Sequence, residues 1–135
     1  MRTLIATLLI GAALGGCSRS HGFGAAEGEQ VAQATYARER ITAEEIAATQ
    51  ATNAYEVTRL LRPSWLAGRG PQSLRAEVSP YPVVYVDDQR MGGLEWLRTI
   101  SAESVAEIRF VSASDATTRW GTGHPAGVIL VLTRR

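Results

Sequence analysis

Apolar side chains near the end of the chain fall into two runs that have the character of β-strands. Ile108 and Phe110 belong to the first run, residues 107–112, and residues 128–132 form the second, which is continuously aliphatic. β-Branched, aromatic and aliphatic residues suit half-buried or buried strands. Because the two runs are so close in sequence, we expect them to be neighbours in one sheet.

The segment between these two runs predicts a short helix and then a glycine-rich reversal. Residues 113–120 read as helix and end on Trp120. Gly121, Gly123 and Gly127 permit positive φ, and Pro125 cannot continue a strand ladder. We therefore predict that Trp120 and the three glycines form a structural turn motif, without a catalytic role.

The first helix of the folded part is predicted to start at residue 42. Thr42 and Glu45 have capping-box spacing, so each side chain can bind a backbone amide at the helix start. Ile41 and Ile46 occupy the positions of a hydrophobic staple.

A second helix is predicted after Asn53, because Asn53 and Glu56 repeat the capping spacing. Pro63 ends this helix at residue 62 or just before it. Trp65 is expected to fold back into the core, with a ligand-stacking role as the alternative. The expected apolar face of the helix comprises Ala54, Val57, Leu60 and Leu61.

The middle of the chain predicts a central strand. Residues 81–86 are largely apolar, as in a strand covered on both faces, and residues 87–89 suit a turn. Residues 94–99 then predict a helical turn, and Ser101 is the expected N-cap of another short helix. We therefore predict an α+β domain with a small mixed sheet and two to four short helices.

The start of the chain has a different pattern. Residues 4–14 form an apolar run that is within the length of a signal-peptide core and too short to cross a bilayer. The run closes on Leu14, Gly15, Gly16 and Cys17. This ending resembles the lipobox of bacterial lipoproteins, which implies cleavage after Gly16 and lipid attachment at Cys17; a buried free cysteine is the alternative.

The predicted organisation therefore has three parts. Residues 1–16 are a lipoprotein signal peptide, residues 17–40 a flexible tether that is at most marginally helical after residue 30, and residues 41–135 the folded domain. Ser18 follows the cysteine, and in the lipoprotein family an aspartate there often signals retention in the inner membrane. The resemblance thus implies an outer-membrane location, on either its periplasmic face or the cell surface.

Composition and charge exclude some partners. The chain has 14 basic residues, all arginine, scattered among 13 acidic ones. Removing residues 1–16 takes away Arg2 and leaves 13 of each sign, so the mature net charge is zero. Nucleic-acid binding normally needs a clustered basic face, so we expect no nucleic-acid partner.

The folded part resembles the plug domain of TonB-dependent receptors. Residues 81–88 resemble the family's Pro-Val-x-Val-x-Asp-Gly segment, and residues 101–135 resemble its strand, aromatic-Gly turn and Gly-Val-Ile strand. Asp88 stands where the family usually has glycine. In the receptors the plug lies inside a barrel of about 22 strands, and no barrel sequence follows Arg135. The resemblance therefore implies a fold and an envelope location, but it does not imply transport activity.

Candidate catalytic chemistry is sparse. His21 and His124 are the only histidines that could act as neutral bases, and Asp87 and Asp88 could bind a hard cation only with help from Glu95. Adjacent strand residues point to opposite faces, which disfavours that site. We therefore expect no enzyme activity, no metal and no cofactor.

The leading hypothesis is a non-catalytic lipoprotein whose plug-like domain binds another envelope protein or a ligand. An accessory subunit of a TonB-dependent uptake system is the alternative, with a β-barrel transporter as its partner. A small envelope hydrolase that uses Asp87, Asp88 or His124 is a third possibility.

Overall fold

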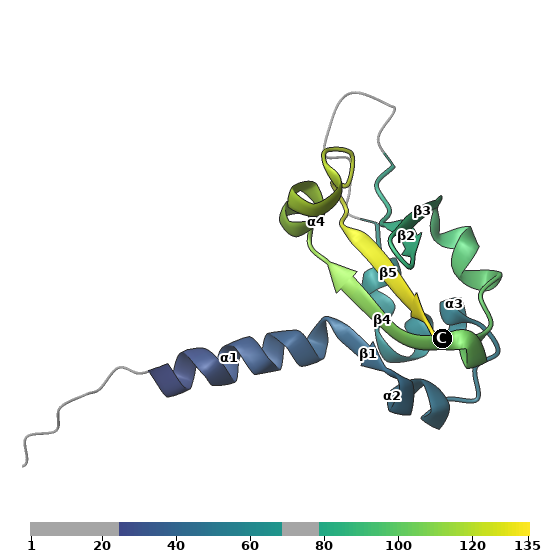
Figure 1. Cartoon of the computed structure of the whole chain (residues 1–135), viewed down its shortest axis with the longest axis horizontal. Coiled ribbons are helices and arrows are strands. Elements are labelled where there is room, and N and C mark those ends of the chain that lie inside the picture. The colour runs from purple at the N-terminus through teal and green to yellow at the C-terminus, as the bar shows by residue number, and fades with distance from the viewer. Residues whose placement is uncertain (1–24, 69–78) are drawn as a thin grey trace, which may run out of the picture.

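The computed structural model describes residues 25–68 and 79–135. It confirms an α+β fold with one mixed sheet of five strands. Figure 1 shows helix α1 extending away from the sheet, whereas the other helices lie close to the sheet. The elements run in the order α1 (Ala25–Arg38), β1 (Arg40–Thr42), α2 (Ala43–Ala48), α3 (Ala54–Leu61), η1 (Pro63–Leu66), β2 (Val83–Val86), β3 (Gln89–Gly92), η2 (Leu94–Arg98), η3 (Ala102–Ser104), β4 (Val105–Val111), α4 (Ala113–Trp120) and β5 (Val128–Thr133).

The sheet has the strand order β1-β4-β5-β2-β3. β4 and β5 pair in antiparallel fashion, as their closeness in sequence predicted. β2 lies parallel to β5, and all other neighbours are antiparallel. β5 is therefore the central strand, and the two shortest pairings lie at the edges.

Two strands at the edges of the sheet were missed by the sequence prediction. β1 includes Ile41 and Thr42, for which only the staple and the cap of a helix were expected, and α2 begins at Ala43, directly after the predicted cap Thr42. β3 follows a turn of only two residues, Asp87 and Asp88, which both have positive φ. Such a turn fits the twist of a two-residue hairpin, so Gln89 already belongs to the returning strand. Asp88 thus adopts, at φ 70°, a conformation that glycine would otherwise supply.

Helix starts were predicted well where side chains cap them. The capping box between Thr42 and Glu45 is present, and Asn53 accepts a hydrogen bond from the Glu56 amide. α3 ends at Leu61, before Pro63, as expected. Ser101 stands at the N-cap of η3, but its side chain makes no capping hydrogen bond, in contrast to the prediction.

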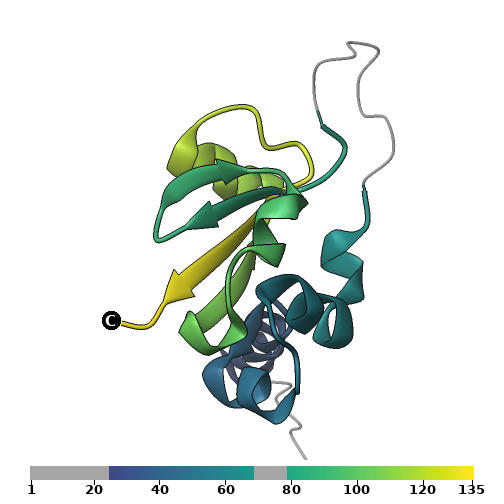
Figure 2. The ribbon, with the colours of Figure 1, turned by 90° about the vertical axis from the view of Figure 1, so that its right-hand side faces the viewer.

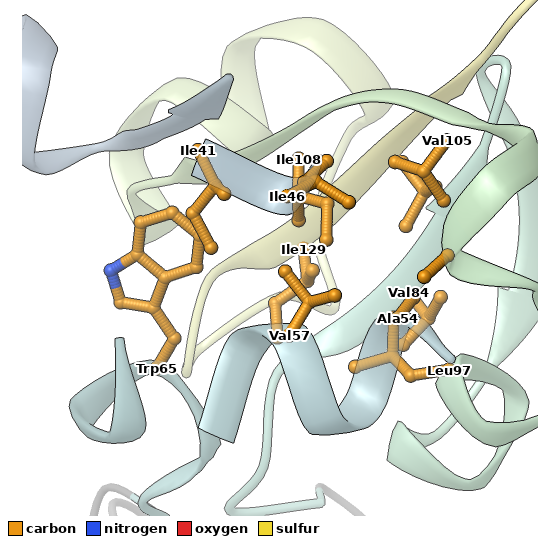
Figure 3. Close-up of a cluster of buried hydrophobic side chains, with 12 residues drawn as sticks. Ile41, Ile46, Ala54, Val57, Trp65, Val84, Leu97, Val105, Ile108 and Ile129 are labelled. Atoms are coloured by element: carbon orange, nitrogen blue, oxygen red, sulfur yellow. The ribbon is translucent and has the colours of Figure 1, made fainter. Parts of the chain in front are cut away.

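The main core lies on one face of the sheet, where α2, α3, η1 and η2 cover it (Figures 2 and 3). Trp65 is buried there and its ring stacks on Phe110, with ring centroids 5.7 Å apart. Trp65 is thus a core residue and does not present its ring to a ligand. Leu60 was predicted on the buried side of α3, but it is 60% exposed, because the helix turns this position toward solvent.

The opposite face of the sheet carries a smaller apolar cluster beneath α4. It comprises Val83, Tyr85, Ala116, Val128 and Leu130. β2 therefore contributes to both clusters, with Val84 on the main face, as the prediction of a strand covered on both faces requires.

Residues 25–38 differ from the predicted tether, because they form a helix. Every residue from 28 to 38 is exposed, so little packing supports this helix along its length. Its 14 residues give a length of about 21 Å.

Candidate functional site

The predicted lipobox lies outside the described residues. This applies to Leu14, Gly15, Gly16 and Cys17, and also to the candidate base His21. Lipid attachment at Cys17 therefore stays a prediction from the sequence.

The predicted turn motif is present, and its three glycines adopt the positive φ values that the turn requires. Gly121, Gly123 and Gly127 have φ values of 84°, 109° and 86°. A Cβ atom on Gly127 would lie 2.6 Å from the Val111 carbonyl oxygen and 2.9 Å from the Phe110 ring. Gly127 is therefore required both by its backbone conformation and by the close approach of β4. These are structural reasons, as the sequence suggested.

His124 lies within this reversal and is engaged through both ring nitrogens. Nδ1 lies 3.1 Å from the carbonyl oxygen of Gly121, and Nε2 lies 2.9 Å from the Tyr85 hydroxyl oxygen. A carbonyl can only accept, so Nδ1 donates to Gly121, and in this tautomer Nε2 accepts a hydrogen bond from the Tyr85 hydroxyl. The ring is only 5% exposed and lies beside Trp120. His124 therefore fixes the turn to β2, with no nitrogen left for a substrate or a metal.

The acidic candidates are also bound to other residues. Asp87 accepts hydrogen bonds from the Thr133 amide at 3.0 Å and the Thr133 hydroxyl at 2.5 Å, which lower the pKa of its carboxyl. Asp88 pairs with Arg119 at 2.7 Å, and Glu95 accepts from the Gly93 amide at 3.2 Å. Within the described ranges, no group of three potential ligands is arranged to hold a metal ion.

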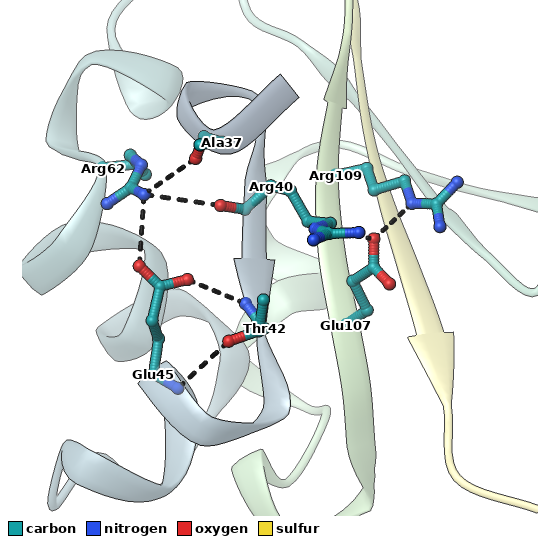
Figure 4. Close-up of polar contacts among 7 residues, drawn as sticks. All are labelled: Ala37, Arg40, Thr42, Glu45, Arg62, Glu107 and Arg109. Atoms are coloured by element: carbon teal, nitrogen blue, oxygen red, sulfur yellow. Dashed lines mark hydrogen bonds and ion pairs between the residues drawn. The ribbon is translucent and has the colours of Figure 1, made fainter. Parts of the chain in front are cut away.

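Arg62 ties the C-terminal end of α1 to the body of the domain (Figure 4). Its Nε donates to the Arg38 carbonyl at 3.3 Å, and Nη2 donates to the Ala37 carbonyl at 3.2 Å. The last carbonyls of a helix have no partner within the helix, and a cation there also interacts favourably with the helix dipole. One side chain, from the residue that directly follows α3, thus caps a helix that has few other contacts.

The same arginine closes the outer edge of β1. Arg62 Nη2 donates to the Arg40 carbonyl at 3.4 Å and to Glu45 Oε1 at 3.2 Å. Glu45 Oε2 in turn accepts from the Thr42 amide at 2.9 Å. An edge strand normally leaves such backbone groups free to pair with another chain. In β1, the side chains of Arg62 and Glu45 bind the Arg40 carbonyl and the Thr42 amide instead. These two groups are therefore not available to pair with an added strand.

A shallow hollow of about 260 Å³ lies between α3 and η2. Arg98 stacks on the Tyr55 ring, 4.5 Å from its centroid. Glu56 accepts from both the amide and the hydroxyl of Thr52. Much of the lining is thus engaged within the protein; it comprises Asn53, Tyr55, Glu56, Arg59 and Arg98.

The half of the second sheet face that α4 leaves uncovered carries charged residues. Arg40 and Arg109 are directly opposite each other on β1 and β4. Glu107 contacts both, and its Oε1 lies 3.9 Å from Arg40 Nε and accepts a hydrogen bond from Arg109 Nε (Figure 4). This hydrogen bond raises the pKa of Arg109.

Four charged residues of these contacts were not among the candidates predicted from the sequence: Arg40, Arg62, Glu107 and Arg109. For Glu107 and Arg109 a signal existed, because they alternate with the core residues Ile108 and Phe110 and so had to share the other face. For Arg62 there was none, since its partners lie up to 25 residues away.

Comparison with known proteins gives no match. No protein-family model matches the chain, and neither curated proteins nor solved structures include a match to it. The structure by itself defines the class as an α+β domain with a five-stranded mixed sheet and a projecting N-terminal helix. The helices in the described part are all too short or too polar to span a membrane.

Proposed function

We propose that this protein is a non-catalytic outer-membrane lipoprotein whose plug-like domain is a binding module for another envelope protein or a ligand. The observation that carries the proposal is the junction at Arg62. It joins a helix of 14 residues, which is exposed from residue 28 to residue 38 and follows the predicted lipid attachment site, to the folded domain. A helix in that place is a spacer about 21 Å long.

The state of the polar residues supports binding over catalysis. His124, Asp87 and Asp88 were the candidate residues for hydrolysis, and each has structural partners. A nucleophile or general base needs a free lone pair within reach of the substrate. Meanwhile, charged side chains lie on an uncovered part of the sheet, which is a surface suited to a macromolecular partner.

Metabolic labelling tests the anchor. The tagged full chain is expressed in a Gram-negative host with an alkyne analogue of palmitate, beside the variants Cys17→Ser and Ser18→Ala. We expect label and outer-membrane fractionation for the parent and Ser18→Ala, and neither for Cys17→Ser. Soluble, unlabelled parent protein would refute the lipoprotein assignment.

Cross-linking in cells, followed by purification of the tagged protein, tests the binding module. We expect an envelope protein to be captured with the parent and lost with Cys17→Ser. Capture of a β-barrel transporter would identify the protein as an accessory subunit of TonB-dependent uptake. If neither an envelope protein nor a small molecule is retained, the binding role is wrong.

A further inference from the structure

The uncovered part of the sheet contains an electrostatic conflict. Arg40 and Arg109 are direct cross-strand partners on the same face. Side chains in that relation have Cβ atoms about 4.5–5.5 Å apart, and like charges there destabilise the pairing.

Glu107 relieves only part of this conflict. A single carboxylate oxygen, Oε1, serves both guanidinium groups, at 3.9 Å from Arg40 Nε and in a hydrogen bond with Arg109 Nε. Two positive charges therefore share one negative charge. Within the described part of the chain, the terminal nitrogens of Arg40 and Arg109 donate to no other side chain or carbonyl. A guanidinium offers five N–H donors, so most of this capacity is available.

The arrangement is open to a partner. The side chains of Arg40 and Arg109 are 45% and 43% exposed, whereas Glu107 beneath them is 20% exposed.

We propose that Arg40 and Arg109 form a docking site for a carboxylate of an acidic segment in a partner protein. The incoming carboxylate supplies the second negative charge and accepts hydrogen bonds from the guanidinium groups. Such charge-assisted pairs are strong and directional. The inference rests on the proposed binding function and gives the chemistry of the partner.

The charge pattern around the site favours a short acidic segment over a long polyanion. Glu107 contacts both arginines, the exposed Glu39 directly precedes Arg40 in the chain, and the chain as a whole has 14 basic and 13 acidic residues. Binding of a polyanion needs a continuous basic face, whereas Arg40 and Arg109 are enough to bind one or two carboxylates.

The test is an NMR titration of the full chain, purified in a non-ionic detergent, with a hexaglutamate peptide at low ionic strength. We expect saturable shifts of the Arg40 and Arg109 Nε–H signals. A hexaglutamine peptide is expected to cause none. Absence of saturable shifts with hexaglutamate, or equal shifts with hexaglutamine, would overturn the proposal.

Variants separate the site from general charge effects. Arg40→Gln and Arg109→Gln should each raise the dissociation constant for hexaglutamate about tenfold or more, as loss of a charge-assisted hydrogen bond does. Arg90→Gln is the matched control, because Arg90 is an exposed arginine on β3 at the opposite edge of the sheet. An equal loss in Arg90→Gln would overturn the proposal, as would tighter saturable binding of inorganic phosphate than of hexaglutamate.

Thermal melting shows whether these variants remain folded. Arg40→Gln should keep its melting temperature while it loses the peptide, since its contact with Glu107 is long. Loss of both together would assign Arg40 to folding instead. The labelling at Cys17 does not depend on these arginines, so failure of the docking site and failure of the lipoprotein assignment give different results.

Discussion

The two faces of the sheet are covered to very different extents. On one face, α2, α3 and two short 3-10 helices enclose an apolar core that includes Ile41, Val57, Leu97 and Ile129. On the other, α4 covers β5 and β2 but leaves β1 and β4 with Arg40, Glu107 and Arg109. The difference indicates a division of roles, in which one face supplies stability and the open half of the other is available for binding.

The largest expected loss of stability is at Gly127, where the chain comes close to β4. Gly127→Val should destabilise the domain by about 3–5 kcal/mol, because it combines a strained φ with overlap on the Val111 carbonyl. That is a large part of the about 5–15 kcal/mol of a typical domain. Chemical denaturation measures the change.

Gly121→Val separates the two causes in that variant. Gly121 also has positive φ, but no atom lies within 4 Å of a Cβ built on it. We expect a loss of about 1–3 kcal/mol from backbone strain alone. Equal losses in both variants would show that the approach of β4 does not matter.

The packed face predicts the next largest effect. Leu97 is fully buried in the main core, so Leu97→Ala should cost about 2–5 kcal/mol through lost burial and a cavity. Leu60→Ala is the control, because Leu60 is 60% exposed and should change stability by less than about 0.5 kcal/mol. Similar melting curves for the two variants would contradict the assignment of the core.

The covered half of the second face predicts a smaller effect. Tyr85→Phe keeps the ring beneath α4 and removes only the hydrogen bond to His124. The buried Nε2 is left without a donor, which should cost about 1–3 kcal/mol. Tyr81→Phe, at a half-exposed tyrosine, should have no measurable effect on thermal unfolding.

The junction with α1 predicts a local effect. Arg62→Ala removes the donors to the Ala37, Arg38 and Arg40 carbonyls, and an exposed helix of this length is marginal alone. We expect faster hydrogen exchange in α1 and a global loss of about 1 kcal/mol or less. Arg59→Ala, in the last turn of α3, should leave exchange in α1 unchanged. Parallel changes in both variants would argue against the cap.

The open half of the second face predicts the smallest effect. Arg40→Gln should melt at or slightly above the parent temperature, because it relieves the cross-strand repulsion. Arg109→Gln should cost up to about 1 kcal/mol, since it removes a hydrogen bond to Glu107. A large loss in Arg40→Gln would mean that this half also serves stability.

The sequence by itself determined the interior of the sheet and the starts of α2, α3 and α4. The strands β4 and β5, α4 between them, and the glycines of the reversal all lie where the residues predicted. The reason is that these features depend on local chemistry, such as apolar runs, capping side chains and positive φ. The lipobox at Leu14, Gly15, Gly16 and Cys17 is also a sequence inference and stays one.

Only the tertiary structure decided the edges and the surface. β1 and β3 are short and polar, and they are strands because β4 and β2 offer pairing partners. The Arg62 cap and the opposed arginines join residues from different elements, so no local pattern could reveal them. Contacts of that kind bring together residues that are far apart in sequence, so they form only when the core has packed.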